Sequence, residues 1–241
     1  MKGIIPAAGM GNRLKPITLA IPKELLMIGD KAVIEHVINA MKKVNITEIT
    51  IVVGWRKHAI LDYLGSGERL GVKLTYVVQE KRTGLAKAVY AGKHVNKDEP
   101  FLVVLGDNFF YPTTFLKNII NFHKKQKADA TIGVAQVKDP TRHGMIKPGK
   151  EKKIDDIIEK PSKKQSPSKL GCIGIYVFNP DIYKAIENTK PGYNNEYQLT
   201  DSIKKLIDNK KKVYYQEISG KHIDIGTIDD LKKANEFIIN H

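Results

Sequence analysis

The sequence predicts an α/β fold in which a mostly parallel, doubly wound sheet is joined by a smaller lobe. Short runs rich in β-branched residues alternate with longer segments whose apolar residues recur at helical spacing. After about residue 128 this rhythm changes to shorter strands, with connections rich in Pro, Lys and Ser. Alternation of strands and helices at this interval is typical of parallel sheets with a crossover helix after each strand.

The first half of the chain contains most of the expected regular structure. Strands are expected over residues 3–7, 49–53, 74–78 and 101–105, and helices over 33–44, 57–64 and 85–94. Ligands of such sheets bind beyond the carboxyl ends of the strands. We therefore expect the functional residues in the loops that follow these strands.

The second half is expected to form a lobe over the strand ends of the first half, within one domain that spans residues 1–241. Strands are expected over 131–137, 154–159 and 172–178, with an exposed connection at 161–167 and a closing amphipathic helix over 228–239. No internal repeat is present in the sequence.

Composition and charge exclude several functional classes. The chain carries 40 Lys and Arg residues against 26 Asp and Glu residues, a formal net charge of +14. The basic residues are spread in pairs, and no aromatic residues alternate with them, so we expect a charged surface that suits anionic phosphate substrates and no nucleic-acid binding. No apolar run approaches the length of a bilayer span, and the N-terminus becomes Gly-rich too early for a signal peptide. We expect no membrane contact and a cytoplasmic location.

The single cysteine, Cys172, allows neither an intrachain disulfide nor a cysteine metal cluster. Its neighbours Gly171 and Ile173 are small or apolar, so we expect Cys172 in a buried strand and not as a nucleophile.

A loop of small residues follows the first expected strand. Residues 7–16, Ala-Ala-Gly-Met-Gly-Asn-Arg-Leu-Lys-Pro, could close backbone N–H groups around phosphates. Leu14 replaces the third glycine of the dinucleotide fingerprint, and no Gly-Lys-Ser/Thr closes the loop, which disfavours NAD dehydrogenases and Walker-type NTPases. Arg13 and Lys23 could clamp a triphosphate. The alternative is an ordinary strand-to-helix turn.

Two carboxylates are candidates for a metal site. Asp107 follows the fourth strand in Gly-Asp-Asn-Phe-Phe, and Asp224 lies in Asp-Ile-Gly-Thr near the C-terminus. Together with phosphate oxygens they suit Mg²⁺, a hard cation that keeps several waters. For either residue alone, a turn or helix cap is the alternative.

Several motifs, in order, resemble those of the sugar-1-phosphate nucleotidylyltransferases. They are Gly9-x-Gly11-x-Arg13-Leu14-x-Pro16-x-Thr18, Pro22-Lys23-Glu24-Leu25-Leu26 and Lys31-x-Val33-Ile34-Glu35, and the resemblance continues from Lys2 to about Asn235. It implies the Rossmann-like fold of nucleotide-diphospho-sugar transferases, with nucleotide binding in about residues 1–128 and sugar-phosphate binding in about residues 129–241.

The resemblance also implies site residues. Catalytic roles fall to Arg13, Lys23, Asp107 and Lys160, and Mg²⁺ is bound by Asp107 and Asp224. The nucleotide is expected to contact Ala8, Gly9, Gly11, Asn12, Arg13, Gln79 and Gly84. The sugar phosphate is expected to contact Asn108, Gly144, Glu159, Lys160, Cys172, Tyr176 and Glu196. A glutamine amide such as that of Gln79 can both donate to and accept from a pyrimidine edge.

The implied reaction joins dTTP or UTP to glucose-1-phosphate and releases pyrophosphate. The Pro-Ala-Ala-Gly and Pro-Lys-Glu segments favour uridylyltransferases, whereas residues 105–110 favour thymidylyltransferases. Another phosphate acceptor, such as N-acetylglucosamine-1-phosphate, mannose-1-phosphate or phosphocholine, and a non-catalytic nucleotide-sugar sensor remain as alternatives. A homo-oligomer is possible, but the sequence does not address it.

Three positions depart from the family's usual residues. Asn12 stands where threonine is usual, Ile173 where threonine is often found, and His222 where tryptophan is frequent. The Asn12 backbone and amide can still donate to phosphate. His143 precedes Gly144 in a sugar-side motif, but a phosphate monoester is already an anionic nucleophile and needs no general base, so we interpret His143 as a loop residue.

Overall fold

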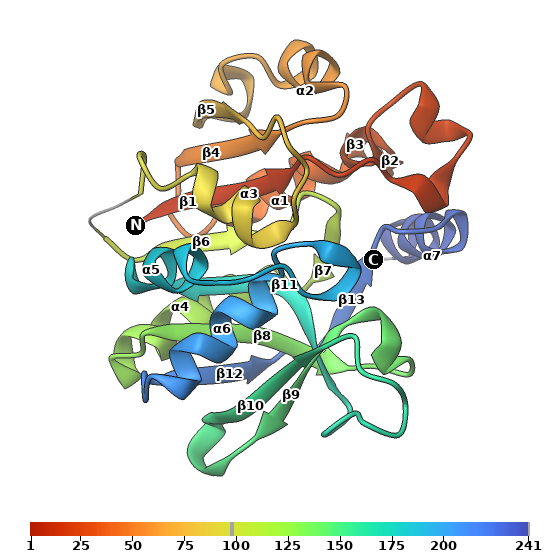
Figure 1. Ribbon diagram of the computed structural model, residues 1–241. Helices are drawn as coiled ribbons and strands as arrows, with labels where there is room; N and C mark the ends of the chain where they lie inside the picture. The colour runs from red at the N-terminus through yellow and green to blue at the C-terminus, as the bar shows by residue number, and fades with distance from the viewer. Residues whose placement is uncertain (97–98, 241) are drawn as a thin grey trace.

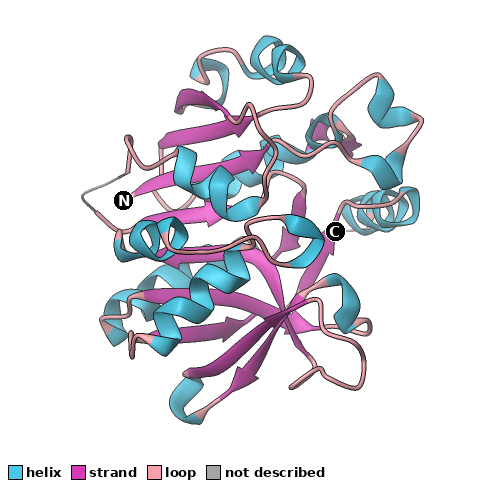
Figure 2. Ribbon diagram, in the orientation of Figure 1, coloured by secondary structure: helices cyan, strands magenta, loops and turns pink. Residues whose placement is uncertain are grey.

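A single mixed sheet runs through the whole chain in the computed structural model, which describes residues 1–96 and 99–240 (Figures 1 and 2). Within that part, nine strands pair in the order β10-β9-β11-β6-β1-β4-β5, with β8 beside β11 and β12 beside β8. The predicted α/β fold is confirmed, and the two halves share one sheet.

The Rossmann-like part consists of parallel strands. It contains β1 (Lys2–Ala7), β4 (Glu48–Val53), β5 (Lys73–Val78) and β6 (Phe101–Val104), and β1 lies between β4 and β6. Each strand is rich in β-branched and apolar side chains, and β1 and β4 are almost fully buried, as expected for strands covered on both faces.

The second half adds antiparallel pairing, which the sequence rhythm alone did not predict. Its central strand, β11 (Leu170–Phe178), runs antiparallel to β6 and to β8 (Ala130–Gln136). The remaining strands of the sheet are β9 (Gly144–Pro148), β10 (Ile154–Glu159) and β12 (Val213–Glu217). The β9–β10 hairpin extends away from the body of the sheet (Figure 1).

Helices cover both faces of the sheet. Side chains of α1 (Val33–Lys42), α2 (Lys57–Leu64) and α4 (Phe115–Gln126) belong to one apolar core. Side chains of α3 (Leu85–Ala91), α5 (Asp181–Glu187) and α6 (Leu199–Asp208) belong to the core on the opposite face. This arrangement confirms the doubly wound prediction.

A third, smaller core lies beside the carboxyl ends of the parallel strands. There the helix α7 (Ile228–Ile239) packs near the short hairpin β2 (Met27–Ile28) and β3 (Lys31–Ala32) and near the ribbon of β7 (Asn108–Tyr111) and β13 (Lys221–Asp224). The Thr227 hydroxyl accepts the Asp230 N–H at 3.2 Å and so caps α7, whose predicted bounds are confirmed. No helix among the described residues is long and apolar enough to cross a membrane.

Candidate active site

The loop after β1 is shaped by one glycine. Gly11 has φ of 62°, and the carbonyl of this residue accepts hydrogen bonds from the Thr18 hydroxyl at 2.8 Å and the Leu14 N–H at 2.9 Å. A Cβ at Gly11 would lie 2.7 Å from Thr18 Cγ2. Both the positive φ and this close approach require glycine at position 11.

Backbone pairing brings the two candidate metal ligands together. Asp224 ends β13 directly opposite Asn108, the first residue of β7, and the Ile225 N–H donates to the Asp107 carbonyl at 3.0 Å. The Lys23 ammonium forms an ion pair with the Asp107 carboxylate, and Arg13 Nη2 lies 3.9 Å from Asp224 Oδ2. Four residues with predicted catalytic or metal roles, far apart in sequence, therefore meet at one point.

Burial and charge separate the acid strengths of this cluster. Burial raises the pKa of Asp107, but the Lys23 charge and hydrogen bond outweigh it and hold that pKa below its usual value. Burial and the charge of Asp107 raise the pKa of Asp224 to about 7. Burial opposes the charge on Lys23, yet Asp107, Glu24 and Asp224 hold the Lys23 pKa above its usual value. The two aspartates thus form a pair in which one carboxylate is ionised and the other holds its proton more strongly.

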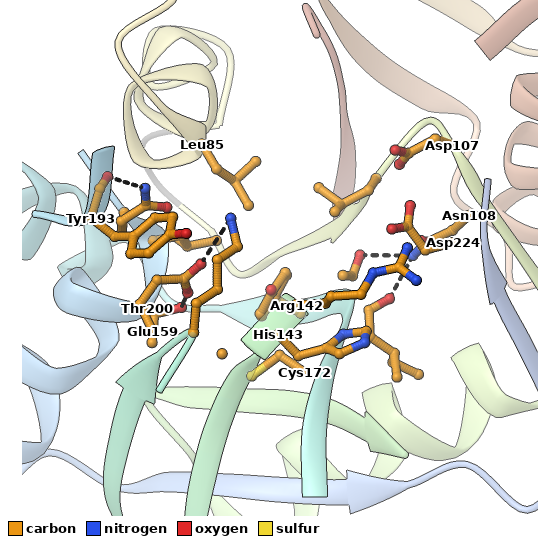
Figure 3. Close-up of a pocket in the computed structure, with 18 of the residues that line it drawn as sticks. Leu85, Asp107, Asn108, Arg142, His143, Glu159, Cys172, Tyr193, Thr200 and Asp224 are labelled. Carbon is orange, nitrogen blue, oxygen red and sulfur yellow. Dashed lines mark hydrogen bonds and ion pairs between the residues drawn. The ribbon is translucent and has the colours of Figure 1, made fainter. Parts of the chain in front are cut away.

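Two cavities adjoin at this cluster, because Lys23, Asp107, Leu85 and Leu105 line both. One cavity, of about 550 Å³, extends toward the ends of β1 and β5 and is called the nucleotide-side cavity below. The other, of about 400 Å³, extends toward β9, β10 and β11 and is called the sugar-side cavity. Figure 3 shows Asp107 and Asp224 on one side of the sugar-side cavity, with Tyr193, Glu159 and Thr200 across it.

The sugar-side cavity has an anchored carboxylate. Glu159, the last residue of β10, accepts a hydrogen bond from the Thr200 hydroxyl at 2.6 Å and lies 3.6 Å from the Lys160 ammonium. A Cβ at Gly144 would lie 2.7 Å from Thr200 Oγ1 and 3.1 Å from Glu159 Oε2, so a larger residue there would displace this pair. The Lys160 ammonium lies 5.0 Å from the Tyr193 ring centroid, a cation–π distance.

A bulge in β11 forms the floor of the sugar-side cavity. The pairing of β11 with β8 shifts between Cys172 and Tyr176, and Gly174 within this segment has φ of 69°. The Asn108 amide donates to the Ile173 carbonyl at 2.6 Å, which fixes the bulge to β7. Cys172 and Tyr176 are buried, and burial raises the pKa of each, so neither is poised to ionise.

The nucleotide-side cavity contains most of the residues predicted for the nucleotide. Ala8, Gly9, Asn12, Gln79 and Gly84 line it, while Gly11 shapes the loop without lining either cavity, and Arg13 lines the sugar-side cavity. The Gln79 amide donates to the Gly84 carbonyl at 3.2 Å. This bond orients the side chain and leaves its oxygen available to a ligand.

Comparisons with known proteins agree with this arrangement. The family model described as nucleotidyl transferase matches residues 2–241. The chain belongs to the nucleotidyl transferase family. It is 34% identical to the UTP–glucose-1-phosphate uridylyltransferase of Bacillus subtilis, over 93% of this chain and 86% of that protein. It is 31% identical to a low-salt glycan biosynthesis nucleotidyltransferase of Haloferax volcanii, over 99% of this chain but only 66% of that protein.

Solved structures of nucleotidyl transferases have the same fold. A UDP-glucose pyrophosphorylase complexed with UDP-glucose superposes with a TM-score of 0.92 at 29% identity, covering 99% of this chain and 98% of that one. A Bacillus anthracis protein described as a glucose-1-phosphate thymidylyltransferase superposes with a TM-score of 0.88 at 34% identity, covering 98% and 94%. The resemblance inferred from the motifs is confirmed, and the chain is an enzyme of this family.

The site of this nucleotidyl transferase also contains residues to which the sequence analysis gave no individual role. Arg142, Tyr193 and Thr200 line the sugar-side cavity, and Glu24 lines the nucleotide-side cavity. Arg142 ends the exposed turn Pro140–Arg142, where its sequence context resembles that of many other surface arginines and lysines. Glu196, predicted for the sugar phosphate, lines the nucleotide-side cavity.

The carboxylate pair can be tested for its fit to a divalent cation. No group of three His, Cys, Asp or Glu side chains that could hold a metal occurs in residues 1–96 and 99–240. Asp107 and Asp224 lie close enough for the first charge to raise the pKa of the second, a cost that a cation between them would remove. Two carboxylates are few for a calcium cage but suit Mg²⁺, which retains waters and takes further oxygens from phosphates.

Proposed function

We propose that this enzyme joins UTP or dTTP to glucose-1-phosphate, with Mg²⁺ bound by Asp107 and Asp224, and releases pyrophosphate. The observation that carries the proposal is the meeting of the two cavities at Lys23 and Asp107. A triphosphate in one cavity and a sugar phosphate in the other have their reacting atoms at a shared boundary. About residues 1–128 supply the nucleotide side, and about residues 129–241 supply most of the sugar side.

The proposed reaction is an in-line displacement at the α-phosphorus. A phosphate oxygen of the sugar phosphate forms the new P–O bond, and the bond from the α-phosphorus to the bridging oxygen breaks, so that its electron pair leaves with pyrophosphate. The metal supplies charge neutralisation on the phosphate oxygens. Lys23, beside Asp107, and Arg13, beside Asp224, place positive charge where negative charge develops.

The sugar-side residues hold the acceptor. Lys160 provides a positive charge for the sugar phosphate, and Glu159, held by Thr200, accepts hydrogen bonds from sugar hydroxyls. Because the nucleophile is already an anion, no general base is needed. Orientation of the two phosphates and charge stabilisation account for the catalysis.

The comparisons include relatives that support UTP and a relative that supports dTTP as the nucleotide substrate. Relatives at 33–34% identity are named UTP–glucose-1-phosphate uridylyltransferases, and a structure at 34% identity is described as a glucose-1-phosphate thymidylyltransferase. Gln79 and Gly84 offer a pyrimidine the donor and acceptor it requires. The relatives' substrates are therefore the first to test.

The test is pyrophosphate release with Mg²⁺ over a matrix of substrates. UTP, dTTP, CTP, ATP and GTP are each combined with the 1-phosphates of glucose, galactose, mannose and N-acetylglucosamine. We expect the highest rate with a pyrimidine triphosphate and glucose-1-phosphate. If no substrate pair releases pyrophosphate and the protein still binds a nucleotide-sugar, the protein is a nucleotide-sugar sensor and the proposed reaction is wrong.

The variant Asp107→Asn tests whether the rate depends on the carboxylate pair. We expect its kcat to fall by at least about a hundredfold, since loss of one electrostatic partner at a transition state commonly has this size. Asp62→Asn, on the exposed surface of α2, is the matched control and should keep the wild-type rate. Equal rates for both variants would show that Asp107 does not hold the metal.

A further inference from the structure

Two arginine side chains lie close to the ring of Trp55, two residues beyond the end of β4. The Cζ atom of Arg56 lies 5.5 Å from the Trp55 ring centroid, and the Cζ atom of Arg82 lies 5.8 Å from it. Both distances are within the range of cation–π attraction. The indole therefore holds two guanidinium groups in one small region.

Neither guanidinium is neutralised within the part of the chain that the structure describes. No ion pair or hydrogen bond of the Arg56 or Arg82 side chain occurs among those residues. Glu80, an acidic side chain close in sequence, lies 3.4 Å from Lys57. Two like charges that share one ring repel each other, and a bound anion would remove that repulsion.

This cluster is tied to the phosphate loop. The Trp55 indole N–H donates to the Thr18 carbonyl at 3.3 Å, and the Thr18 hydroxyl donates to the Gly11 carbonyl at 2.8 Å. Arg82 itself lines the nucleotide-side cavity together with Met10 and Asn12 of that loop. Arg82, in the connection after β5, thus lines the same cavity as the loop after β1.

We propose that Arg82, which shares the Trp55 ring with Arg56, binds the outer phosphates of the nucleoside triphosphate and hence the departing pyrophosphate. The inference rests on the proposed function, because it assigns a role within the same nucleotide-side cavity. A guanidinium is suited to this ligand, since its planar donors match phosphate oxygens in a two-point contact. Arg56, which does not line the cavity, adds positive charge close to the same indole ring.

The reverse reaction separates the outer phosphates from the rest of the nucleotide, because pyrophosphate and the nucleotide-sugar enter as different substrates. For Arg82→Gln we expect the KM for pyrophosphate, and the forward KM for the triphosphate, to rise about tenfold, as loss of one charge-assisted contact predicts. The KM for the nucleotide-sugar should stay within about twofold. Lys81→Gln, which removes the neighbouring exposed charge, should leave all three values unchanged.

Three results would overturn the inference. A KM increase confined to the nucleotide-sugar would place Arg82 against the base or ribose. Unchanged values for Arg82→Gln would remove it from the site, and equal effects of Arg82→Gln and Lys81→Gln would reduce it to net charge. If the wild-type chain shows no turnover, the proposed function fails, and calorimetric titration with pyrophosphate still tests the inference: tighter binding to wild type than to Arg82→Gln supports it, and equal binding contradicts it.

Discussion

Replacement of Glu24 by glutamine should change how the stability of the enzyme depends on pH. The Glu24 side chain is 1% exposed, and its Oε2 atom has no hydrogen-bond partner among the described residues. Burial raises the pKa of this carboxyl from 4.5 to about 7, against the opposing charge of Lys23. The folded protein therefore holds a proton on Glu24 that the unfolded chain releases.

The magnitude follows from this difference. The difference between a pKa of 4.5 in the unfolded chain and about 7 in the folded protein, at about 1.4 kcal/mol per pKa unit, corresponds to about 3.5 kcal/mol. Because the folded-state pKa is the higher one, the contribution is fully present below pH 4.5 and is lost as the pH rises through 7. The glutamine of Glu24→Gln cannot ionise, so the stability of this variant should not fall in this way as the pH rises.

Urea denaturation of the wild type and Glu24→Gln at half-unit steps from pH 4.5 to 8 measures the effect. From pH 4.5 to 8, we expect the free energy of unfolding of Glu24→Gln to rise by about 3 kcal/mol relative to that of the wild type. Glu24→Met serves as the control for the amide group: its absolute stability is free to differ, but its pH dependence should match that of Glu24→Gln. A constant difference between wild type and both variants from pH 5 to 8 would refute a raised Glu24 pKa.

Three further substitutions test the packing and the sugar side. Gly84→Ala would place a methyl 2.5 Å from the Tyr197 carbonyl oxygen at a φ of 114°, so we expect a loss of at least about 2 kcal/mol of unfolding free energy, measured by chemical denaturation; stability within 0.5 kcal/mol of wild type would contradict this clash. Gly144→Ala would displace the Glu159–Thr200 pair and should raise the KM for the sugar phosphate about tenfold, with the KM for the triphosphate unchanged; steady-state kinetics showing the reverse pattern would move this residue to the other substrate. Lys160→Gln should raise the KM for the sugar phosphate by about tenfold at low salt, and a control at high salt should narrow the difference between variant and wild type.

The parallel half of the fold could be predicted from sequence because its signals are local. The strands β1, β4, β5 and β6 are short runs rich in β-branched and apolar residues, and helix α2 was predicted with its bounds unchanged. The ribbon of β7 and β13 could not be predicted in this way, since each strand has four residues and its partner lies more than a hundred residues away.

The candidate site shows the same division. Roles could be predicted for residues within ordered motifs, such as Lys23 and Asp107, because the resemblance of the motif supplied them. Arg82 and Arg142 lie in charged, exposed connections, where one arginine resembles any other until the fold brings it to a cavity. Glu196 was predicted to contact the sugar phosphate, but it lines the nucleotide-side cavity. A motif gives a residue's place in the chain but not the direction of its side chain.

The pairing of β13 with β7 has a consequence during protein synthesis. The parallel strands, with the glycine loop between β1 and β4, are complete once β6 has been made, but Asp224 joins Asp107 only after β13 has been made and has left the ribosome. A chain whose translation stops before β13 has the phosphate loop but half of the carboxylate pair. Chains that end before β13 should therefore not turn over nucleoside triphosphates, because the carboxylate pair forms only when nearly all of the domain has been made.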